Sequence, residues 1–260
     1  VIVVPPFLFS WIMAVPEAIA CDVSHVRLFA TAAATFPDDL KRDVLKYMPK
    51  AKLIYVYGLT ESSGGNAVLL MHENTFRKSG AIGVVNPLMD YRIVDHRGER
   101  VPVGTAGELL LKGPPVIRGY YKRDEETAAT FVDGWLHTGD IVREDEEGFM
   151  YFVDRLKDMI KTGGENVFAK EVEDALLNHP KISEVAVFGL PDPQWGEKIH
   201  AAVVLKPGME ATDEEILAFA KEHLAGFKRP KAIHFIAALP RNPSGKVLKH
   251  VLKQELADKS

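Results

Sequence analysis

The sequence predicts a mixed fold, in which an α/β portion is followed by antiparallel β structure and then by an α+β portion. Three changes of pattern support this prediction. Short apolar runs alternate with helical patterns to about residue 80, extended runs broken by glycine and proline continue to about residue 153, and helices and strands alternate beyond about residue 158. Strand-helix alternation indicates a parallel sheet, whereas frequent Gly- and Pro-containing turns indicate antiparallel strands.

The α/β portion, residues 1–80, opens with an apolar run that three prolines interrupt. The interruption makes the run a poor membrane span, and it lacks the basic start of a secretory signal. We therefore expect a buried strand at Val1–Val4 and then a partly buried helix. Further along, the apolar spacing predicts strands at 26–30 and 53–57, with a helix at 38–47 between them.

Residues 81–154 are predicted to form a small antiparallel barrel that completes the first domain, 1–154. Strands are expected at 91–94 and 108–112, with a turn after the first. A second domain of ordinary size, 155–260, follows. Its expected elements are a helix at 169–178, strands at 184–189 and 199–205, a helix at 213–225, a strand at 233–239 and a final helix.

Composition narrows the class of protein. The 260 residues are 47% hydrophobic and 26% charged, with a formal net charge of -4. This balance is typical of a globular protein and gives no general attraction to nucleic acid or to an anionic membrane. The single cysteine, Cys21, excludes an internal disulfide framework and suits a cytoplasmic location. The histidines lack metal-ligand spacing, and no P-loop, zinc-protease or hydrolase-elbow motif is present.

Four short segments combine polar, charged and glycine residues of the kind that contact nucleotides. Each alone is weak, because short motifs recur by chance. Their joint occurrence in this order is a stronger signal. The segments are Tyr-Gly-Leu-Thr-Glu at 57–61, Thr-Gly-Asp at 138–140, the stretch 154–165 with Asp-Arg-Leu-Lys-Asp and Lys-Thr-Gly-Gly-Glu, and Asn-Pro-Ser-Gly-Lys at 242–246.

In this order the four segments resemble the signature motifs of the adenylate-forming superfamily, which includes acyl-CoA synthetases, peptide-synthetase adenylation domains and firefly luciferase. The stretches 107–121 and 189–197 are similar to its acyl-CoA branch. The resemblance implies a large domain ending near Asp154 and a mobile C-terminal domain. It also implies an ATP- and Mg²⁺-dependent ligase that converts a small carboxylic acid to acyl-AMP and then to a coenzyme A thioester.

The resemblance assigns catalytic roles to three residues. A carboxylate and the α-phosphate of ATP are both anionic, so the site needs cations where they meet. Lys246 lies where the family places the lysine that bridges them. Glu61 is similar to the family's magnesium ligand, as Mg²⁺ prefers carboxylate and phosphate oxygens. Thr60 would bond a phosphate oxygen.

Further residues are expected to hold the nucleotide. Asp140 can accept hydrogen bonds from both ribose hydroxyls, and Arg155 would reinforce that end or form a surface ion pair. Tyr57 would stack on adenine or serve as a core aromatic. Ala33 would let the base approach the backbone, and Gly58 belongs to the same predicted site.

The second half-reaction is assigned to the C-terminal domain. Lys157 lies where the family has its hinge, whose backbone torsions change as the domain swings. Gly163 and Gly164 resemble the loop that shapes the thiol channel. Three basic residues either contact coenzyme A phosphates or are solvated surface charges: Lys161, Lys228 and Arg229.

The sequence departs from the family at its start. Residues 1–56 do not resemble the family's Ser/Thr/Gly-rich phosphate-binding loop, so we expect either a longer protein that has been cut or a natural short form. Adenylation by this chain alone is therefore in doubt. An incomplete sheet would expose an edge and favour a homo-oligomer. A non-catalytic nucleotide- or partner-binding remnant, and a module serving a carrier protein, are the alternatives.

Overall fold

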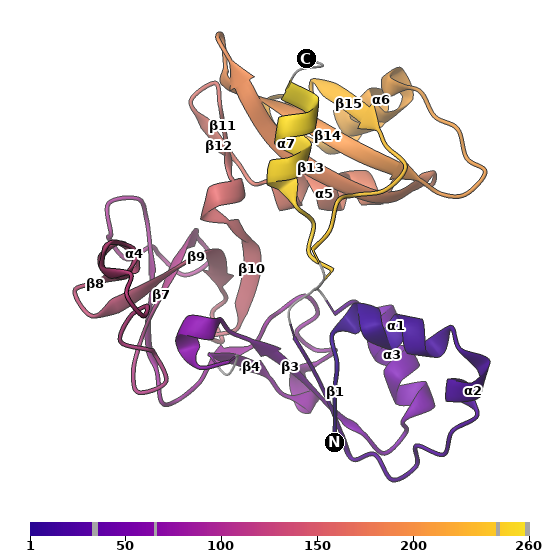
Figure 1. Ribbon diagram of the computed structural model, residues 1–260, viewed down its shortest axis with the longest axis vertical. Coiled ribbons are helices and arrows are strands. Elements are labelled where there is room, and N and C mark those ends of the chain that lie inside the picture. Colours follow the sequence, from indigo (N-terminus) through magenta and orange to yellow (C-terminus); the bar gives the residue numbers. More distant parts are fainter. Residues whose placement is uncertain (33–35, 65–66, 243–244, 258–260) are drawn as a thin grey trace. The chain divides into compact units, whose positions relative to one another are not determined.

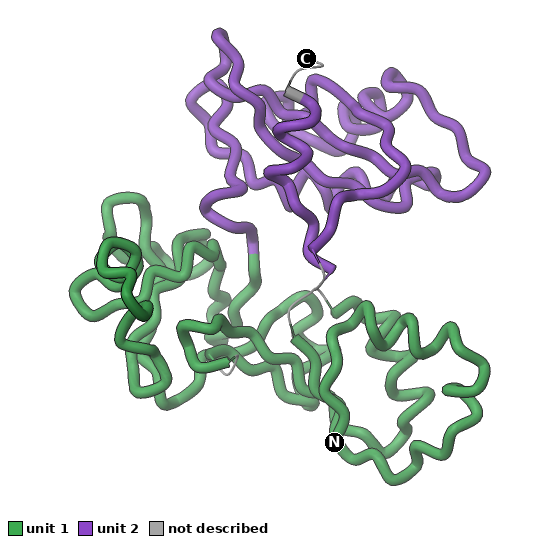
Figure 2. Tube along the Cα trace, viewed as in Figure 1, with its two compact units in different colours: residues 1–152 green, residues 153–260 purple. Residues whose placement is uncertain are grey.

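The computed structural model describes residues 1–32, 36–64, 67–242 and 245–257 (Figure 1). They form two compact units, Val1–Phe152 and Val153–Ser260, which Figure 2 distinguishes by colour. The domain boundary predicted after Asp154 lies in the strand that joins the units, β10 (Met150–Arg155). Within the described ranges, no helix has the length and apolar character needed to cross a bilayer.

The first sheet of unit 1 has the strand order β1-β2-β3-β4-β5. Its first three strands are parallel, as the alternating pattern predicted, and the last two are antiparallel to their neighbours. The bounds are β1 (Ile2–Val3), β2 (Leu28–Ala32), β3 (Lys52–Tyr57), β4 (Val68–Leu70) and β5 (Val84–Val85).

Three helices accompany this sheet: α1 (Pro6–Met13), α2 (Pro16–Ile19) and α3 (Asp38–Tyr47). The bounds of α3 confirm the predicted helix. Val44 of α3 and Leu53 of β3 are fully buried in one apolar cluster, because the helix turns its apolar side toward the sheet. This packing fixes the direction of β3 and therefore the position of Tyr57 at its end and of the residues that follow.

The expectation of a buried strand at Val1–Val4 is wrong. Val1 is 83% exposed and Val3 is 71% exposed. The reason is that β1 is the edge strand of the described sheet and is paired with β2 alone, so its apolar composition did not ensure burial.

The second sheet of unit 1 is antiparallel and forms a half-barrel in the region where a small barrel was predicted. Its strand order is β10-β9-β7-β6, with β8 paired to β9, so β10 and β6 stand at opposite ends of the order. The expected strands at 91–94 and 108–112 lie within β6 and β7. The elements are β6 (Asp90–Val94), β7 (Ala106–Lys112), α4 (Asp124–Thr130), β8 (Phe131–Val132) and β9 (Trp135–Glu144).

Unit 2 contains a sheet of order β12-β11-β14-β13, with β15 parallel to β14. The predicted helices are present, the strands expected at 184–189 and 199–205 are longer than expected, and the last strand is shorter. The bounds are β11 (Ile160–Thr162), β12 (Glu165–Val167), α5 (Ala169–Leu177), β13 (Ile182–Asp192), β14 (Gly196–Leu205), α6 (Asp213–His223), β15 (Ala232–Phe235) and α7 (Lys249–Ala257).

Both faces of the unit 2 sheet are covered. Val187 of β13 packs with Val172 of α5 and Ile216 of α6 in one cluster. The next residue, Phe188, packs with Leu252 of α7 in another. Successive strand residues point to opposite faces, so an apolar strand buried on both faces needs helices on both sides.

Candidate active site

Glu61 lies in a short 3-10 helix, η1 (Thr60–Ser62), directly after β3. The Ser62 hydroxyl accepts a hydrogen bond from the Leu59 amide and donates one to the Leu59 carbonyl, both at 3.0 Å. The Glu61 carbonyl accepts from the Ile117 amide at 2.9 Å, which ties the turn to a second loop. The backbone that carries Glu61 is thus held from two directions.

The Glu61 carboxylate is held as well. The Tyr120 hydroxyl donates to Glu61 Oε1 at 2.6 Å, and this bond is the main cause of the raised pKa of Tyr120. Tyr120 is itself fixed, because its amide donates to Thr127 Oγ1 at 2.9 Å and its ring meets Phe131 edge-on. One carboxylate oxygen therefore has a defined orientation.

Tyr57 and Asp140 lie together although 83 positions separate them in the sequence. The Tyr57 hydroxyl donates to Asp140 Oδ2 at 2.6 Å. Asp140 is 2% exposed, whereas Tyr57 is partly buried. The structure thus places two residues predicted from separate motifs in direct contact.

The turn before Asp140 is built by side-chain hydrogen bonds. Thr138 Oγ1 donates to the Leu109 carbonyl at 2.6 Å and accepts from the Asp140 amide at 3.1 Å. The Gly139 amide donates to Glu108 Oε1 at 3.0 Å, and Glu108 Oε2 lies 3.1 Å from His137 Nδ1. Gly139 has φ +67°, a left-handed conformation that glycine adopts without the Cβ clash.

Glu61, Tyr120 and the turn before Asp140 border one cleft of about 260 Å³ in unit 1. Its lining brings together the 3-10 helix, the turn of β9 and helix α4. Two carboxylates face it, so a cation accompanied by an anionic ligand would balance its charge. The lining residues are Leu59, Glu61, Glu108, Tyr120, Ala129, Thr130, Leu136, His137, Thr138 and Gly139.

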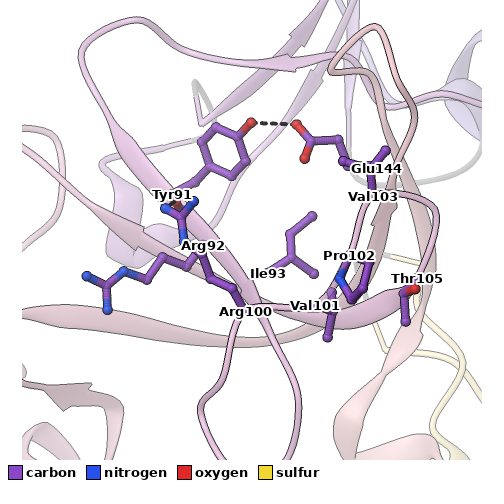
Figure 3. A pocket seen from close by; sticks show the side chains of 9 residues that line it. All are labelled: Tyr91, Arg92, Ile93, Arg100, Val101, Pro102, Val103, Thr105 and Glu144. Atoms are coloured by element: carbon purple, nitrogen blue, oxygen red, sulfur yellow. Dashed lines mark hydrogen bonds between the residues drawn. The ribbon is translucent and has the colours of Figure 1, made fainter.

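A second hollow, of about 70 Å³, lies between β6, β9 and the loop 100–105 (Figure 3). The Tyr91 hydroxyl donates to Glu144 Oε1 at 2.5 Å across it, and this bond raises the pKa of Tyr91 to about 12. Its lining contains none of the residues predicted from the motifs, and its small volume suits water or a small ion better than a nucleotide.

In unit 2, Lys246 lies on a tight turn between two bridged residues, Arg241 and Val247. The Asn242 amide donates to the Lys246 carbonyl at 3.0 Å, and Asn242 Oδ1 accepts from the Lys246 amide at 2.9 Å. Arg241 donates to the Gly245 carbonyl at 2.7 Å and also pairs with Glu184. Arg241 thus anchors this segment to β13, and Lys246 is exposed.

Lys157 is exposed in another 3-10 helix, η3 (Leu156–Asp158), directly after β10. The preceding Asp154 is 4% exposed and accepts hydrogen bonds from the amides of Arg155 at 2.7 Å and Lys170 at 3.1 Å. Burial raises the pKa of Asp154. The chain is therefore fixed to the start of α5 immediately before Lys157.

Gly163 and Gly164 form the turn of the β11–β12 hairpin, with φ values of +59° and +83°. The Gly163 amide donates to the Trp195 carbonyl at 2.8 Å, and a Cβ at Gly163 would lie 3.0 Å from the Trp195 ring. Trp195 is 44% exposed. The Lys161 amide donates to Glu197 Oε2 at 2.7 Å, so the hairpin rests on the end of the β13–β14 hairpin.

The two basic residues after α6 have local partners. Lys228 pairs with Glu171 at 2.6 Å. Arg229 donates to the carbonyls of Leu224 at 2.9 Å and Lys221 at 3.0 Å, at the C-terminal end of α6. A guanidinium at that position satisfies carbonyls that the helix leaves without partners.

Several expectations are not placed by the structure. Ala33 lies outside the described residues, as do residues 243–244 beside Lys246. Arg155 belongs to unit 2, whereas Tyr57, Gly58, Thr60 and Asp140 belong to unit 1. In the described part of the chain, no three His, Cys, Asp or Glu residues are grouped as metal ligands.

Sequence reasoning did not assign roles to Tyr120, Glu108 or His137. Tyr120 and Glu108 lie in the stretch 107–121, which resembled the acyl-CoA branch, so a signal was present for them. His137 directly precedes the Thr-Gly-Asp motif. Their partners are 29 or 59 positions away, so no local pattern identifies these contacts.

Comparison with known proteins shows related family domains in both units. The AMP-binding enzyme family matches residues 1–121, and the AMP-binding enzyme C-terminal domain matches residues 171–246. The chain is 39% identical to a feruloyl-CoA synthase of an Amycolatopsis species over 94% of its length. It is also 39% identical to the long-chain-fatty-acid–CoA ligase FadD13 of Mycobacterium tuberculosis over 96%. It spans about half of each relative, 49% in both cases.

Solved structures agree. The ATP-bound MatB of Rhodopseudomonas palustris superposes with a TM-score of 0.87 at 32% identity, covering 99% of this chain and 51% of that one. The o-succinylbenzoate CoA synthetase of Bacillus subtilis, in complex with an acyl-adenylate, gives 0.80 at 31% identity, with 96% and 50% covered. The chain therefore belongs to the AMP-binding enzyme family and contains segments of both of its domains.

Proposed function

We propose that this chain supplies active-site residues of an acid-CoA ligase. A carboxylate oxygen attacks the α-phosphorus of ATP, and the bond to pyrophosphate breaks. The thiol of coenzyme A then attacks the acyl carbon, and AMP leaves. The observation that carries the proposal is that Glu61 and the turn before Asp140, predicted from separate motifs, border one cleft.

The nucleotide would lie along this cleft. Asp140 would accept hydrogen bonds from the ribose hydroxyls, since a carboxylate has several acceptor positions. The Tyr57 ring would stack on adenine, and Thr60 would bond a phosphate oxygen. The remaining residues assigned to the nucleotide are Gly58, Arg155 and Ala33.

Glu61 fits a magnesium ion. Mg²⁺ is commonly held by one or two carboxylates together with substrate phosphates and water, so a group of three protein ligands is not required. Glu61 faces the cleft, and the Tyr120 bond sets its orientation. The ion would neutralise phosphate charge there.

Lys246 would supply the cation between carboxylate and α-phosphate. Its exposed position on an anchored turn suits a residue that must reach a substrate. Lys157 would act as the hinge that exchanges this arrangement for the thioester-forming one. The rigid attachment of Asp154 just before it supports this assignment, because a hinge needs a fixed point to move against.

The β11–β12 hairpin would shape the path of the thiol. Its turn is built by Gly163 and Gly164, and Lys161 is exposed at its base. Lys228 and Arg229 remain candidates for coenzyme A phosphates, although their local partners would first have to be exchanged. A cytoplasmic location accords with the single cysteine, and the exposed β1 edge would permit a homo-oligomer.

Pyrophosphate exchange into ATP tests the adenylation step. We would measure it on this chain and on an extended protein, in which the upstream half of the Amycolatopsis feruloyl-CoA synthase precedes Val1. The acid panel would contain ferulate, a long-chain fatty acid, 2-succinylbenzoate and anthranilate, after the names of related enzymes. We expect exchange with at least one acid in the extended protein.

Two results would decide against the ligase. Exchange by neither protein with any acid would favour a binding remnant, which AMP titration of the chain would then identify. Thioester formation with a carrier-protein pantetheine but not with free coenzyme A would identify the protein as an adenylation module that serves a carrier protein. Lys246→Ala in the extended protein serves as the inactive control for adenylation.

A further inference from the structure

Glu108 lies outside the four motifs, yet its carboxylate holds the turn that carries Asp140. We propose that Glu108 is a positioning residue of the nucleotide site and acts through Asp140 on recognition of the ribose. This inference rests on the proposed function, because it takes Asp140 as the ligand of the ribose hydroxyls.

The two oxygens of Glu108 bind on either side of Thr138. Oε1 accepts the Gly139 amide at 3.0 Å, and Oε2 meets His137 Nδ1 at 3.1 Å. The side chain of Glu108 is 14% exposed and that of His137 is 33% exposed, so solvent competes only weakly for these bonds. A single carboxylate thereby clamps both ends of a short segment.

These side-chain bonds are needed because the regular pairing between β7 and β9 is interrupted at this point. Glu108 pairs with Ile141 and Leu110 pairs with His137, so residues 138–140 of β9 face Leu109 alone. Such a bulge removes regular cross-strand partners from the backbone. Two side-chain hydrogen bonds take their place: the Thr138 hydroxyl donates to the Leu109 carbonyl, and the Glu108 carboxylate accepts from the Gly139 amide.

The direction of the Asp140 carboxylate depends on this turn. Asp140 directly follows Gly139, whose left-handed φ of +67° sets the direction in which the chain enters Asp140. Without Glu108, the Gly139 amide would lose its acceptor, and the turn would relax toward one that satisfies it. Asp140 would then meet the ribose in the wrong geometry, even with Tyr57 still in contact.

The ratio of the affinities for AMP and for an analogue without ribose hydroxyls distinguishes a loss of ribose recognition from a general loss of structure. Calorimetric titration of the unmodified chain with AMP and with 2′,3′-dideoxy-AMP measures what the ribose hydroxyls contribute. We expect AMP to bind at least tenfold more tightly. In Glu108→Ala, AMP binding should weaken about tenfold and dideoxy-AMP binding should not change, because only the hydroxyl contacts are lost.

Two variants serve as comparisons. Glu108→Gln keeps an oxygen for the Gly139 amide and an amide group for His137, so most of the selectivity should return. Glu144→Ala removes another hydrogen-bonded carboxylate from the same sheet, at the second hollow, and should leave both affinities unchanged. If Glu108→Ala unfolds, Glu108→Asp replaces it, since the shorter side chain keeps the charge but not the reach to Gly139.

A double-variant cycle completes the test. In an Asp140→Asn background, Glu108→Ala should have no further effect on AMP binding, because the two residues act in series. Equal weakening of AMP and dideoxy-AMP by Glu108→Ala, or no weakening of either, would overturn the inference. An unmodified chain that binds both ligands equally, or binds no AMP, would instead refute the proposed nucleotide site and the inference with it.

Discussion

The Tyr120 hydroxyl donates a 2.6 Å hydrogen bond to Glu61 Oε1. Tyr120 follows Gly119, where a Cβ would lie 2.5 Å from Thr127 Cγ2, so the loop packs closely on α4. The orientation of Glu61 therefore depends on a loop and a helix that come much later in the chain. We infer that the proposed magnesium ligand is oriented from outside its own motif.

Tyr120→Phe should raise the Mg²⁺ concentration needed for half-maximal ATP binding by about tenfold, because a hydrogen bond to a charged group contributes roughly 1.5–3 kcal/mol. Calorimetric titration of the extended protein with ATP at a series of Mg²⁺ concentrations measures this. Binding of AMP without Mg²⁺ should be unaffected. Tyr121→Phe, at a residue that is 86% exposed, is the control, and an equal effect there would contradict the role of Tyr120.

Lys246→Ala in the extended protein should lower the adenylation rate by roughly 100-fold or more, because a preorganised cation at the developing charge is removed. Conversion of a supplied acyl-adenylate to the thioester should be retained. Single-turnover measurement of each half-reaction separates the two. Lys231→Ala, an exposed lysine of the same unit, should leave both rates intact. Equal loss of both half-reactions in Lys246→Ala would disprove the division of roles.

Gly163→Ala and Gly164→Ala form a matched pair. Both place alanine at positive φ, which costs about 1 kcal/mol or more, but only the Gly163 Cβ would meet the Trp195 ring. We therefore expect altered Trp195 fluorescence and a slower thioester step in Gly163→Ala, with adenylation unchanged. A Gly163→Ala/Trp195→Ala double variant should recover part of that rate. Equal effects of the two single changes would exclude the Trp195 contact as the cause.

His200 should make unit 2 sensitive to acid. It is 2% exposed and stacks with both Phe188 and His234, and burial, with lesser contributions from His234 and Lys198, lowers its pKa to about 4. In the unfolded chain a histidine titrates near pH 6.5. Between these two pKa values the histidine is protonated in the unfolded chain but neutral in the folded one. The free energy of unfolding therefore falls as the pH drops from about 7 toward 4.

The expected loss is about 2 kcal/mol between pH 7 and pH 5. Thermal unfolding of the chain at the two pH values, with and without His200→Phe, measures it. Phenylalanine preserves the ring stacking and removes the titrating group. The free energy of unfolding of His200→Phe should therefore fall less between pH 7 and pH 5, by about 2 kcal/mol. An identical pH dependence in both proteins would exclude His200 as the source.

Local pattern was sufficient where one element's own residues decide its structure. The helix at 38–47 was predicted with its observed bounds, because its apolar positions recur at helical spacing and it begins after Pro37. Most elements that the sequence predicted outside residues 113–168 also occur in the expected order, whereas α4, β8, β9, β11 and β12 within that range were not predicted individually. The first and last residues of the strands were predicted less accurately. In β13 and β14, for example, the pairing of the two strands extends both of them beyond their most apolar stretches.

The sequence by itself determined the family, through motifs whose residue types are dictated by nucleotide chemistry, and it determined most elements of the fold. Only the tertiary structure decided that β1 is an exposed edge, that Arg229 binds the end of α6, and that Tyr120 and Glu108 hold Glu61 and the turn of Asp140. The reason is physical. Hydrogen bonds and burial depend on which distant segments meet, whereas periodicity and motifs record only the neighbours of a residue along the chain.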